Sequence, residues 1–240
     1  MEKFMRAKKL YKVLFALIFF CHPASAQNYR QLFAGAYAQA EQTAAELRPM
    51  LNKYATACCE DSKLMEAIIF PELIRYNRLY DVVETGSLMG LYARLGSDYA
   101  DFSIGKLQMK PTFAVSLERF MLMHPELKWV QQLGFDRVAV NDCYENRTAR
   151  INRLDNDEWQ IKYLIAMIKC LRIKHPEIWR NSSAEQKLTL VATAYNCGWD
   201  KSLAMIRATS NKTYYHLNYW DAAVKYSFAH VAWYRYKELI

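Results

Sequence analysis

Glycine and proline are scarce in this chain, and their scarcity is the first guide to its fold. The 240 residues include only seven glycines and six prolines, the two residue types that disfavour helix interiors most. Apolar positions recur mostly three and four residues apart, which is typical of helices and not of strands. The sequence therefore predicts an all-α protein. It shows no linker, internal repeat or second hydrophobic core, so a single domain is expected over residues 27–240.

The apolar run near the N-terminus is too short to span a bilayer. It covers residues 13–20, follows three lysines within residues 8–12, and precedes the small residues Ala24-Ser25-Ala26. This order is typical of a cleavable export signal, with cleavage after Ala26. We therefore expect residues 1–26 to be a signal peptide, with an uncleaved anchor as the lesser alternative.

Clusters of basic residues and metal-ligand patterns are both missing. The formal charge is +8, but residues 1–26 hold five bases and one acid, so the rest of the chain carries +4. A mild positive charge suits an anionic polymer, whereas no run of Lys and Arg interleaved with aromatics argues for a nucleic-acid partner. The five histidines lie without ligand spacing to one another or to cysteines, so neither a metal nor another cofactor is expected.

Five cysteines follow the expected signal peptide, so at least one thiol stays unpaired within a monomer. Cys58 and Cys59 are adjacent and cannot bond to each other without strain. A bridge from one of them to a distant cysteine and a set of buried free thiols are both open alternatives. The other three are Cys143, Cys170 and Cys197.

Apolar periodicity and capping residues predict the course of the helices. Pro71 argues against an uninterrupted helix, because it lacks an amide hydrogen and disfavours helical geometry at Phe70. Glu72 is therefore expected at a kink or helix junction. A break near Gly86 or Gly90 is also expected. Helical segments are predicted at residues 29–57, 62–70, 75–94, 112–124, 157–174, 183–195 and 218–239.

Glu72 is the first candidate for chemistry. It follows the apolar residues 67–70 and precedes Leu73, and apolar surroundings raise the pKa of a carboxyl group. A carboxylic acid that stays neutral near pH 7 is what protonates the leaving oxygen of a glycosidic bond. The ordinary alternative is an exposed glutamate at the end of a helix.

Two turns could hold a polysaccharide against that acid. Gly105 would let the backbone approach a sugar, and Gln108 could bond an acetamido or hydroxyl group. Tyr195 offers a ring face and Asn196 an amide. Taken singly, each turn could equally be a loop or a helix end, so their order and spacing carry the signal. The turns are residues 103–111 (Ser-Ile-Gly-Lys-Leu-Gln-Met-Lys-Pro) and 194–198 (Ala-Tyr-Asn-Cys-Gly).

These stretches resemble the motifs of the soluble lytic transglycosylases and the related goose-type lysozymes, helical enzymes that cut peptidoglycan. The family's glutamate closes an apolar helix and is usually followed by Ser, where this chain has Leu73. Its Gly-Leu-Met-Gln-Leu-Met-Pro motif after a Ser is similar to residues 105–111, and its Ala-Tyr-Asn-Ala-Gly motif to residues 194–198. The resemblance covers roughly residues 64–199.

The resemblance implies a lysozyme-like domain with flanking N- and C-terminal helices, located in the periplasm or cell envelope in peripheral contact with the wall. Residues 75–96 would be an inserted helical unit that walls or caps the groove. Peptidoglycan glycan strands would be the partner. Glu72 would protonate the bond between N-acetylmuramic acid and N-acetylglucosamine, then take a proton from the muramyl C6 hydroxyl, leaving a 1,6-anhydro sugar. The implied substrate-binding residues are Ser103, Gly105, Gln108, Met109, Tyr195 and Asn196.

Two other functions stay open on the sequence. Asp98 and Asp101 precede the second motif, where a base could activate water and make the protein a hydrolytic muramidase. Loop aspartates more often cap the next element. The third alternative is a non-catalytic protein that binds the wall or belongs to a secretion apparatus. A buried Glu72 facing Gln108 and Tyr195 would favour catalysis, and an exposed Glu72 far from both would favour that third alternative.

Overall fold

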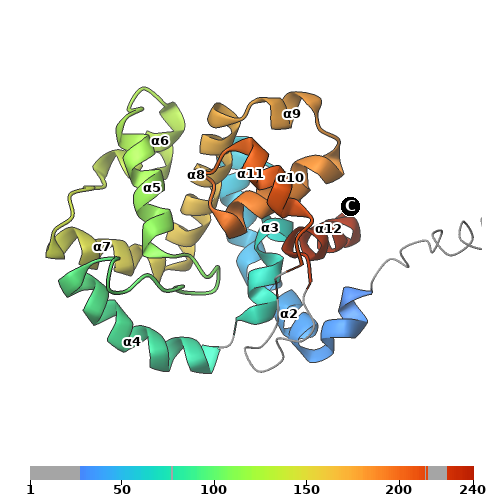
Figure 1. The fold of residues 1–240 in the computed structure, drawn as a ribbon, viewed down its shortest axis with the longest axis horizontal. Coiled ribbons are helices and arrows are strands. Elements are labelled where there is room, and N and C mark those ends of the chain that lie inside the picture. Colours follow the sequence, from blue (N-terminus) through green and yellow to red (C-terminus); the bar gives the residue numbers. More distant parts are fainter. Residues whose placement is uncertain (1–27, 77, 214, 216–225) are drawn as a thin grey trace, which may run out of the picture.

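The computed structural model describes residues 28–240 except residues 77, 214 and 216–225 and the side chains of residues 78–85. Within this part the chain forms eleven α-helices, one short 3-10 helix and no named strand, so the all-α prediction is confirmed (Figure 1). No helix in these residues is long and apolar enough to cross a membrane. The expected signal peptide, residues 1–26, lies outside the described residues.

The helices follow the chain in a simple order. Their bounds are α2 (Tyr29–Cys58), α3 (Ser62–Arg75), α4 (Arg78–Leu95), α5 (Pro111–Leu122), α6 (Lys128–Leu133), η1 (Phe135–Arg137), α7 (Tyr144–Leu154), α8 (Asp157–Lys174), α9 (Glu177–Asn181), α10 (Ala184–Cys197), α11 (Leu203–Ser210) and α12 (Phe228–Leu239).

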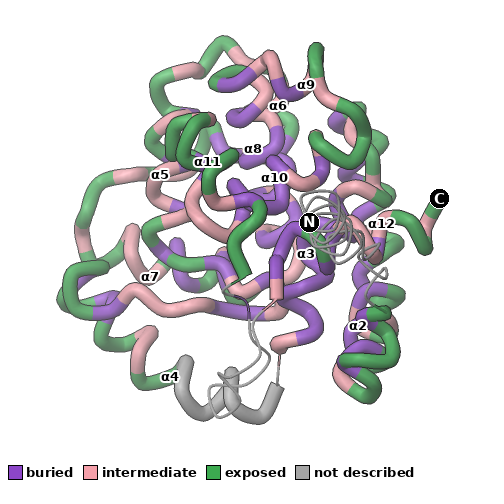
Figure 2. The backbone as a smooth tube through the Cα atoms, turned by 45° about the vertical axis from the view of Figure 1, so that its right-hand side comes forward, coloured by how far each residue is buried: buried purple, intermediate pink, exposed green. Residues whose placement is uncertain are grey.

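Helix α3 lies at the centre of the fold. It packs against α2, α10 and α12, and all ten of residues 65–74 are buried (Figure 2). Asp61 caps its start, because the carboxylate accepts hydrogen bonds from the amides of Lys63 at 2.9 Å and Leu64 at 3.3 Å. A helix that is apolar on nearly every side is stable only when it is surrounded. Because Glu72 belongs to this helix, it lies in the interior of the protein.

The predicted break at Pro71 is wrong, because α3 continues through this residue to Arg75. Pro71 is buried in the last turns of a helix enclosed by its neighbours, and tertiary packing there outweighs the local cost of the ring. The Pro71 carbonyl accepts a hydrogen bond from the hydroxyl of Tyr215. The amide of Tyr76 closes the helix on the carbonyl of Glu72 at 2.8 Å. Glu72 therefore sits in the last turn of one continuous helix.

Helices α4 and α12 also differ from expectation. Helix α4 is not broken at Gly86 or Gly90, because each costs only about 1 kcal/mol in a helix interior. The last helix begins at Phe228 and not at residue 218. Residues 218–225 lie outside the described part. Tyr226 forms an isolated antiparallel bridge with Tyr215, and Ser227 caps α12, so these two residues precede the helix.

Buried ion pairs fasten the helices around this core. Arg235 of α12 pairs with Glu66 of α3 at 2.8 Å. Glu118 of α5 pairs with two arginines of α7, Arg150 at 2.8 Å and Arg153 at 2.9 Å. Both acids are nearly inaccessible to solvent, so loss of one partner would leave a buried charge unpaired.

The cysteines form no disulfide in the described residues. Cys58 and Cys170 are buried, Cys59 is exposed, and Cys143 and Cys197 are half-buried. Of the two alternatives, the structure has free thiols.

Candidate functional site

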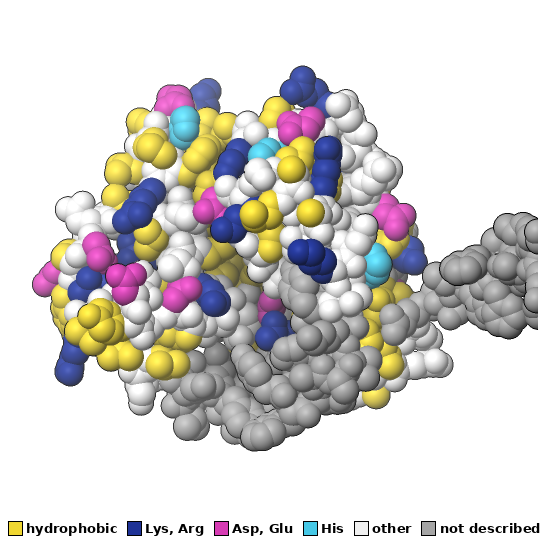
Figure 3. Space-filling model, viewed as in Figure 1, with side chains coloured by type: hydrophobic (Ala, Val, Ile, Leu, Met, Phe, Trp, Pro, Cys, Tyr) yellow, Lys and Arg dark blue, Asp and Glu magenta, His cyan; other side chains and the backbone are white. Residues whose placement is uncertain are grey.

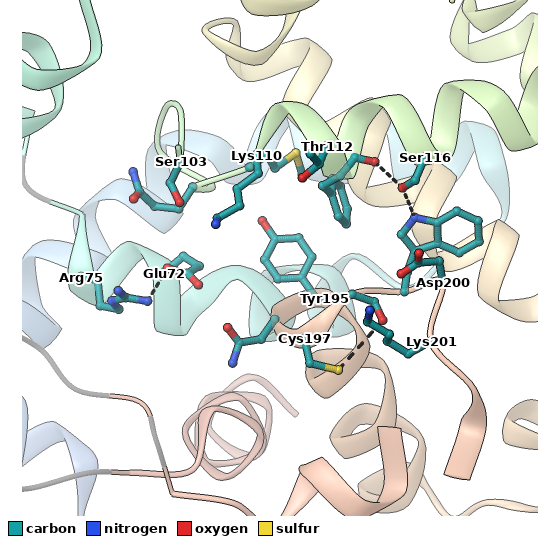
Figure 4. Close-up of a pocket in the computed structure, with 16 residues that line it drawn as sticks. Glu72, Arg75, Ser103, Lys110, Thr112, Ser116, Tyr195, Cys197, Asp200 and Lys201 are labelled. Carbon is teal, nitrogen blue, oxygen red and sulfur yellow. Dashed lines mark hydrogen bonds and ion pairs between the residues drawn. The ribbon is translucent and has the colours of Figure 1, made fainter. Parts of the chain in front are cut away.

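A cavity of about 560 Å³ opens where the end of α3, the turn at residues 103–110, the start of α5 and the end of α10 meet. The face that contains it carries basic and acidic side chains intermixed, with no large field of one sign (Figure 3). Figure 4 shows its walls: Glu72 and Arg75 project from α3, Ser103 and Lys110 lie opposite them, and Tyr195 rises between. The site therefore combines elements that are far apart in sequence.

Glu72 is the buried acid of this cavity. Only 6% of the residue is exposed, and burial raises the pKa of its carboxyl group, while the charge of Arg75 lowers it. Arg75 reaches the carboxylate with Nη1 at 3.5 Å from Oε2. Burial, and in second place the charge of Glu72, raise the pKa values of Tyr195 and Tyr215 well above the usual range. Glu72 thus makes an ion pair with one cation, and its charge acts on two buried phenols.

The second motif is a tight hairpin-like turn closed by Ile104 and Met109. Their backbones exchange hydrogen bonds of 3.0 and 3.2 Å. Gln108 adopts a left-handed conformation with φ of 52°, and its side-chain amide donates to the carbonyl of Gly105 at 2.9 Å. A left-handed non-glycine residue is uncommon and is stabilised here by its own side chain. The turn thereby presents Ser103, Gln108 and Met109 to the cavity.

Gly105 does not line the cavity, contrary to the sequence-based expectation. Its φ is +68°, and a Cβ there would lie 2.4 Å from the side-chain nitrogen of Gln160. Gln160 of α8 donates to the carbonyl of Ile104 at 2.6 Å and accepts from the amide of Leu107 at 3.1 Å. The close approach that this glycine allows is therefore to α8 and not to a ligand.

The third motif ends α10. This helix begins with a capping box, in which Ser183 and Gln186 bond each other's backbone amides at 3.2 and 3.0 Å. It ends at Gly198, which has φ of +112°. Between these ends, Tyr195 and Asn196 face the cavity, and the Tyr195 hydroxyl donates to a backbone carbonyl of the second motif.

The structure places the residues proposed from the sequence in two groups. Asp101 caps α5, because it accepts from the amide of Thr112 at 3.1 Å and from its hydroxyl at 2.9 Å. Asp98 is exposed and, like Asp101, does not line the cavity. Neither aspartate lies in the cavity, where the water-activating base of the alternative muramidase would act. Six other candidates do line the cavity: Glu72, Ser103, Gln108, Met109, Tyr195 and Asn196.

Several cavity residues were not foreseen from the sequence. Arg75 lies three residues after Glu72, a spacing that places two side chains on one helix face. Trp199 and Asp200 directly follow the third motif, and the Trp199 indole donates to the hydroxyl of Ser116 at 2.8 Å. The sequence features that could have identified them are the spacing of Arg75 from Glu72 on one helix and the position of Trp199 and Asp200 next to the third motif. Lys110 and Lys201 also line the cavity.

The described part of the chain holds no group of three or more His, Cys, Asp or Glu side chains that could bind a metal ion. The residues that line the cavity bring carboxyl, hydroxyl, thiol and amide groups, aromatic rings and cations. Comparisons with protein-family models, curated proteins and solved structures found no match to this chain.

Proposed function

We propose that this protein is a peptidoglycan lytic transglycosylase, acting on glycan strands of the cell envelope. The observation that carries the proposal is the buried carboxyl group of Glu72 in the wall of a cavity that Gln108 and Tyr195 also line. Groups from three separate motifs converge there, with the acid in an environment that favours its protonated form. This arrangement also argues against a wall-binding protein without catalysis.

The proposed reaction uses Glu72 twice. The protonated carboxyl group gives its proton to the bridging oxygen as the bond from this oxygen to muramyl C1 breaks. The resulting carboxylate then takes the proton of the muramyl C6 hydroxyl, and O6 bonds to C1 to form the 1,6-anhydro ring. The acetamido group of the substrate stabilises positive charge at C1, so no second carboxylate is required.

The neighbouring side chains suit the binding of a glycan. Gln108 and Asn196 bring amides to the cavity, which can donate to and accept from hydroxyl and acetamido groups. The hydroxyl of Tyr195 is already bonded to Leu107, so we assign sugar contact to its ring. Met109 adds an apolar surface.

A hydrolytic muramidase would need a base that activates water. Asp98 and Asp101 lie outside the cavity, so neither supports this alternative. Asp200 does line the cavity, on the far side of Tyr195 from Glu72 in the view of Figure 4. If hydrolysis were observed, Asp200 would be the first base to test.

The test compares the full chain with its Glu72→Gln variant on purified peptidoglycan, with products identified by mass spectrometry. Glu46→Gln is the matched control, because it makes the same change at an exposed position on α2. We expect anhydro-muropeptides from the parent chain and from Glu46→Gln, and none from Glu72→Gln. Reducing ends in place of anhydro ends would replace the proposal with a hydrolase. No product from the parent chain would overturn an enzymatic function.

A further inference from the structure

Arg75 makes a loose ion pair with the proposed catalytic acid. Its Nη1 lies 3.5 Å from Oε2 of Glu72, whereas tight charge-assisted hydrogen bonds are about 2.7–2.9 Å long. The Arg75 side chain is 31% exposed and lines the cavity. Among the described carboxylates, only Glu72 lies within ion-pair distance of Arg75. The guanidinium therefore keeps donors available on the cavity side.

The ring of Tyr215 supports this guanidinium. Its centroid lies 5.5 Å from the central carbon of Arg75, within the range of a cation–π contact. Tyr215 is in turn anchored by its hydrogen bond to the Pro71 carbonyl. Arg75 thus has a fixed base from which it can turn toward Glu72 or toward the cavity.

A cation beside a general acid makes proton donation less favourable, because it stabilises the ionised carboxylate and lowers the pKa of the acid. Among the described residues, the charge of Glu72 also raises the pKa values of Tyr195 from α10 and Tyr215 from the segment before α12. The cavity also contains Lys110 and, farther away, Lys201 and Asp200, but only Arg75 makes an ion pair with Glu72 in the described chain.

Two other described cations beside α3 pair with a different acid of this helix. Arg48 of α2 pairs with Glu66 at 3.0 Å, and Arg235 of α12 pairs with the same acid at 2.8 Å. Of the cations that the structure describes, Arg75 is the one that pairs with Glu72, so its departure would change the environment of this acid.

We propose that Arg75 is a receptor for a carboxylate on the muramyl substituent, and that binding of this carboxylate draws the guanidinium away from Glu72. Arg75 is then a positioning and specificity residue that couples the recognition of an anionic substrate to the proton donor. The inference rests on the proposed function, because it names the substrate feature that the same site reads. A guanidinium suits this role, since its fork of donors matches a carboxylate.

The carboxylate could belong to the lactyl group in strands without peptide or to the stem peptide in intact strands. Both present the same chemistry to Arg75. Peptide-free strands, their lactyl methyl esters and intact peptide-bearing strands separate the two sources, because only the ester lacks both carboxylates.

The binding experiment is independent of turnover. Calorimetry would measure the binding of two sugars to the full chain with Glu72→Gln. One is a peptide-free tetrasaccharide of alternating N-acetylglucosamine and N-acetylmuramic acid, and the other is its methyl ester. We expect the tetrasaccharide with free carboxylates to bind about tenfold tighter than its ester, a difference of about 1.4 kcal/mol. Adding Arg75→Gln should bring the ratio close to one. Adding Lys63→Gln, which removes one positive charge from an exposed position at the start of the same helix, should leave the ratio unchanged.

The kinetic experiment uses the parent chain, Arg75→Gln and Arg75→Lys on the three kinds of strand. With the parent chain and acidic strands, kcat should fall at a higher pH than kcat/KM does. The reason is that the bound carboxylate has removed Arg75 from Glu72 in the complex but not in the free protein. With esterified strands the two profiles should coincide. In Arg75→Gln, the basic limb of kcat/KM should move to higher pH, and Arg75→Lys should keep part of the preference for acidic strands.

The outcomes separate this inference from the proposed function. An acid-to-ester ratio that Arg75→Gln leaves unchanged would overturn the inference, even if anhydro products form. An Arg75-dependent ratio without any strand cleavage would overturn the proposed function and keep the carboxylate receptor. Preference for intact strands over peptide-free strands would identify the stem peptide as the source of the carboxylate.

Discussion

Tyr195 donates its hydroxyl hydrogen to the backbone carbonyl of Leu107, which lies 88 residues earlier in the chain. Tyr195 lies within the third motif and Leu107 within the second, so this bond fixes two walls of the cavity relative to each other. Both residues are buried. The spacing between Gln108 and Asn196 therefore depends on an interaction made by neither amide.

The Tyr195→Phe variant tests this coupling. It leaves the carbonyl of Leu107 buried without its side-chain partner, which should cost about 1–2 kcal/mol of unfolding free energy in urea titrations. We expect kcat for release of anhydro products to fall about tenfold or more, because small misplacements of reacting groups are costly. Tyr144→Phe is the control, since Tyr144 is 52% exposed. Equal effects of the two variants would contradict the coupling.

The raised pKa of Glu72 predicts how stability depends on pH. Burial raises the pKa of this carboxyl group in the folded state, so folded protein binds more protons than unfolded protein between the two pKa values. Stability contributed by Glu72 is then present below its unfolded pKa of about 4.3 and is lost as pH rises through the folded value.

Glu72→Gln should remove this dependence. The variant is expected to melt at a higher temperature than the parent chain at about pH 8 and at nearly the same temperature at about pH 4. Thermal scans by circular dichroism at both pH values would check this, with Glu46→Gln showing no pH-dependent difference. A Glu72→Gln variant less stable than the parent at the higher pH would show that the ionised acid is stabilised in the fold.

How far the fold could be predicted depended on whether local signals agreed with packing. The bounds of α8 match the predicted segment 157–174, because its apolar pattern agrees with the packing, and Asn156 caps its start by accepting from the amide of Trp159 at 3.1 Å. At Pro71 the local rule and the packing disagreed, and burial on all sides prevailed. No sequence-local rule states how strongly neighbouring helices will enclose a segment.

In the candidate site, too, the sequence predicts some residues correctly, whereas the roles of others depend on distant parts of the chain. The motif positions of Glu72 and Gln108 fall in the cavity because motif spacing reflects side chains that share one space. The sequence predicts that Gly105 contacts the ligand, but a glycine indicates only that some other group approaches the backbone closely. The approaching group is Gln160, more than 50 residues later. Asp101 likewise could be a base or a cap, and only its distances to Thr112 decide the matter.

Gly105→Ala should lower the free energy of unfolding, although the substitution adds only one methyl group. The new Cβ would lie 2.4 Å from the Gln160 side-chain nitrogen, and φ of +68° is itself unfavourable for alanine. We expect a loss of about 1–3 kcal/mol in urea titrations. Gly86→Ala is the control, because a Cβ there meets nothing within 4 Å and alanine should stabilise the helix by about 0.5–1 kcal/mol. A neutral Gly105→Ala would contradict the clamp by Gln160.

Glu118 of α5 is the buried counter-charge of two arginines of α7. Its side chain is fully buried and pairs with Arg150, which is only 1% exposed, and with Arg153. Glu118→Gln keeps the shape but leaves the arginines without their buried counter-charge, so we expect a loss of about 3–5 kcal/mol in urea titrations. Asp136→Asn breaks an exposed pair of 3.9 Å and should cost less than about 1 kcal/mol. Similar losses from both substitutions would show that the Glu118 pairs contribute no more than a surface ion pair does.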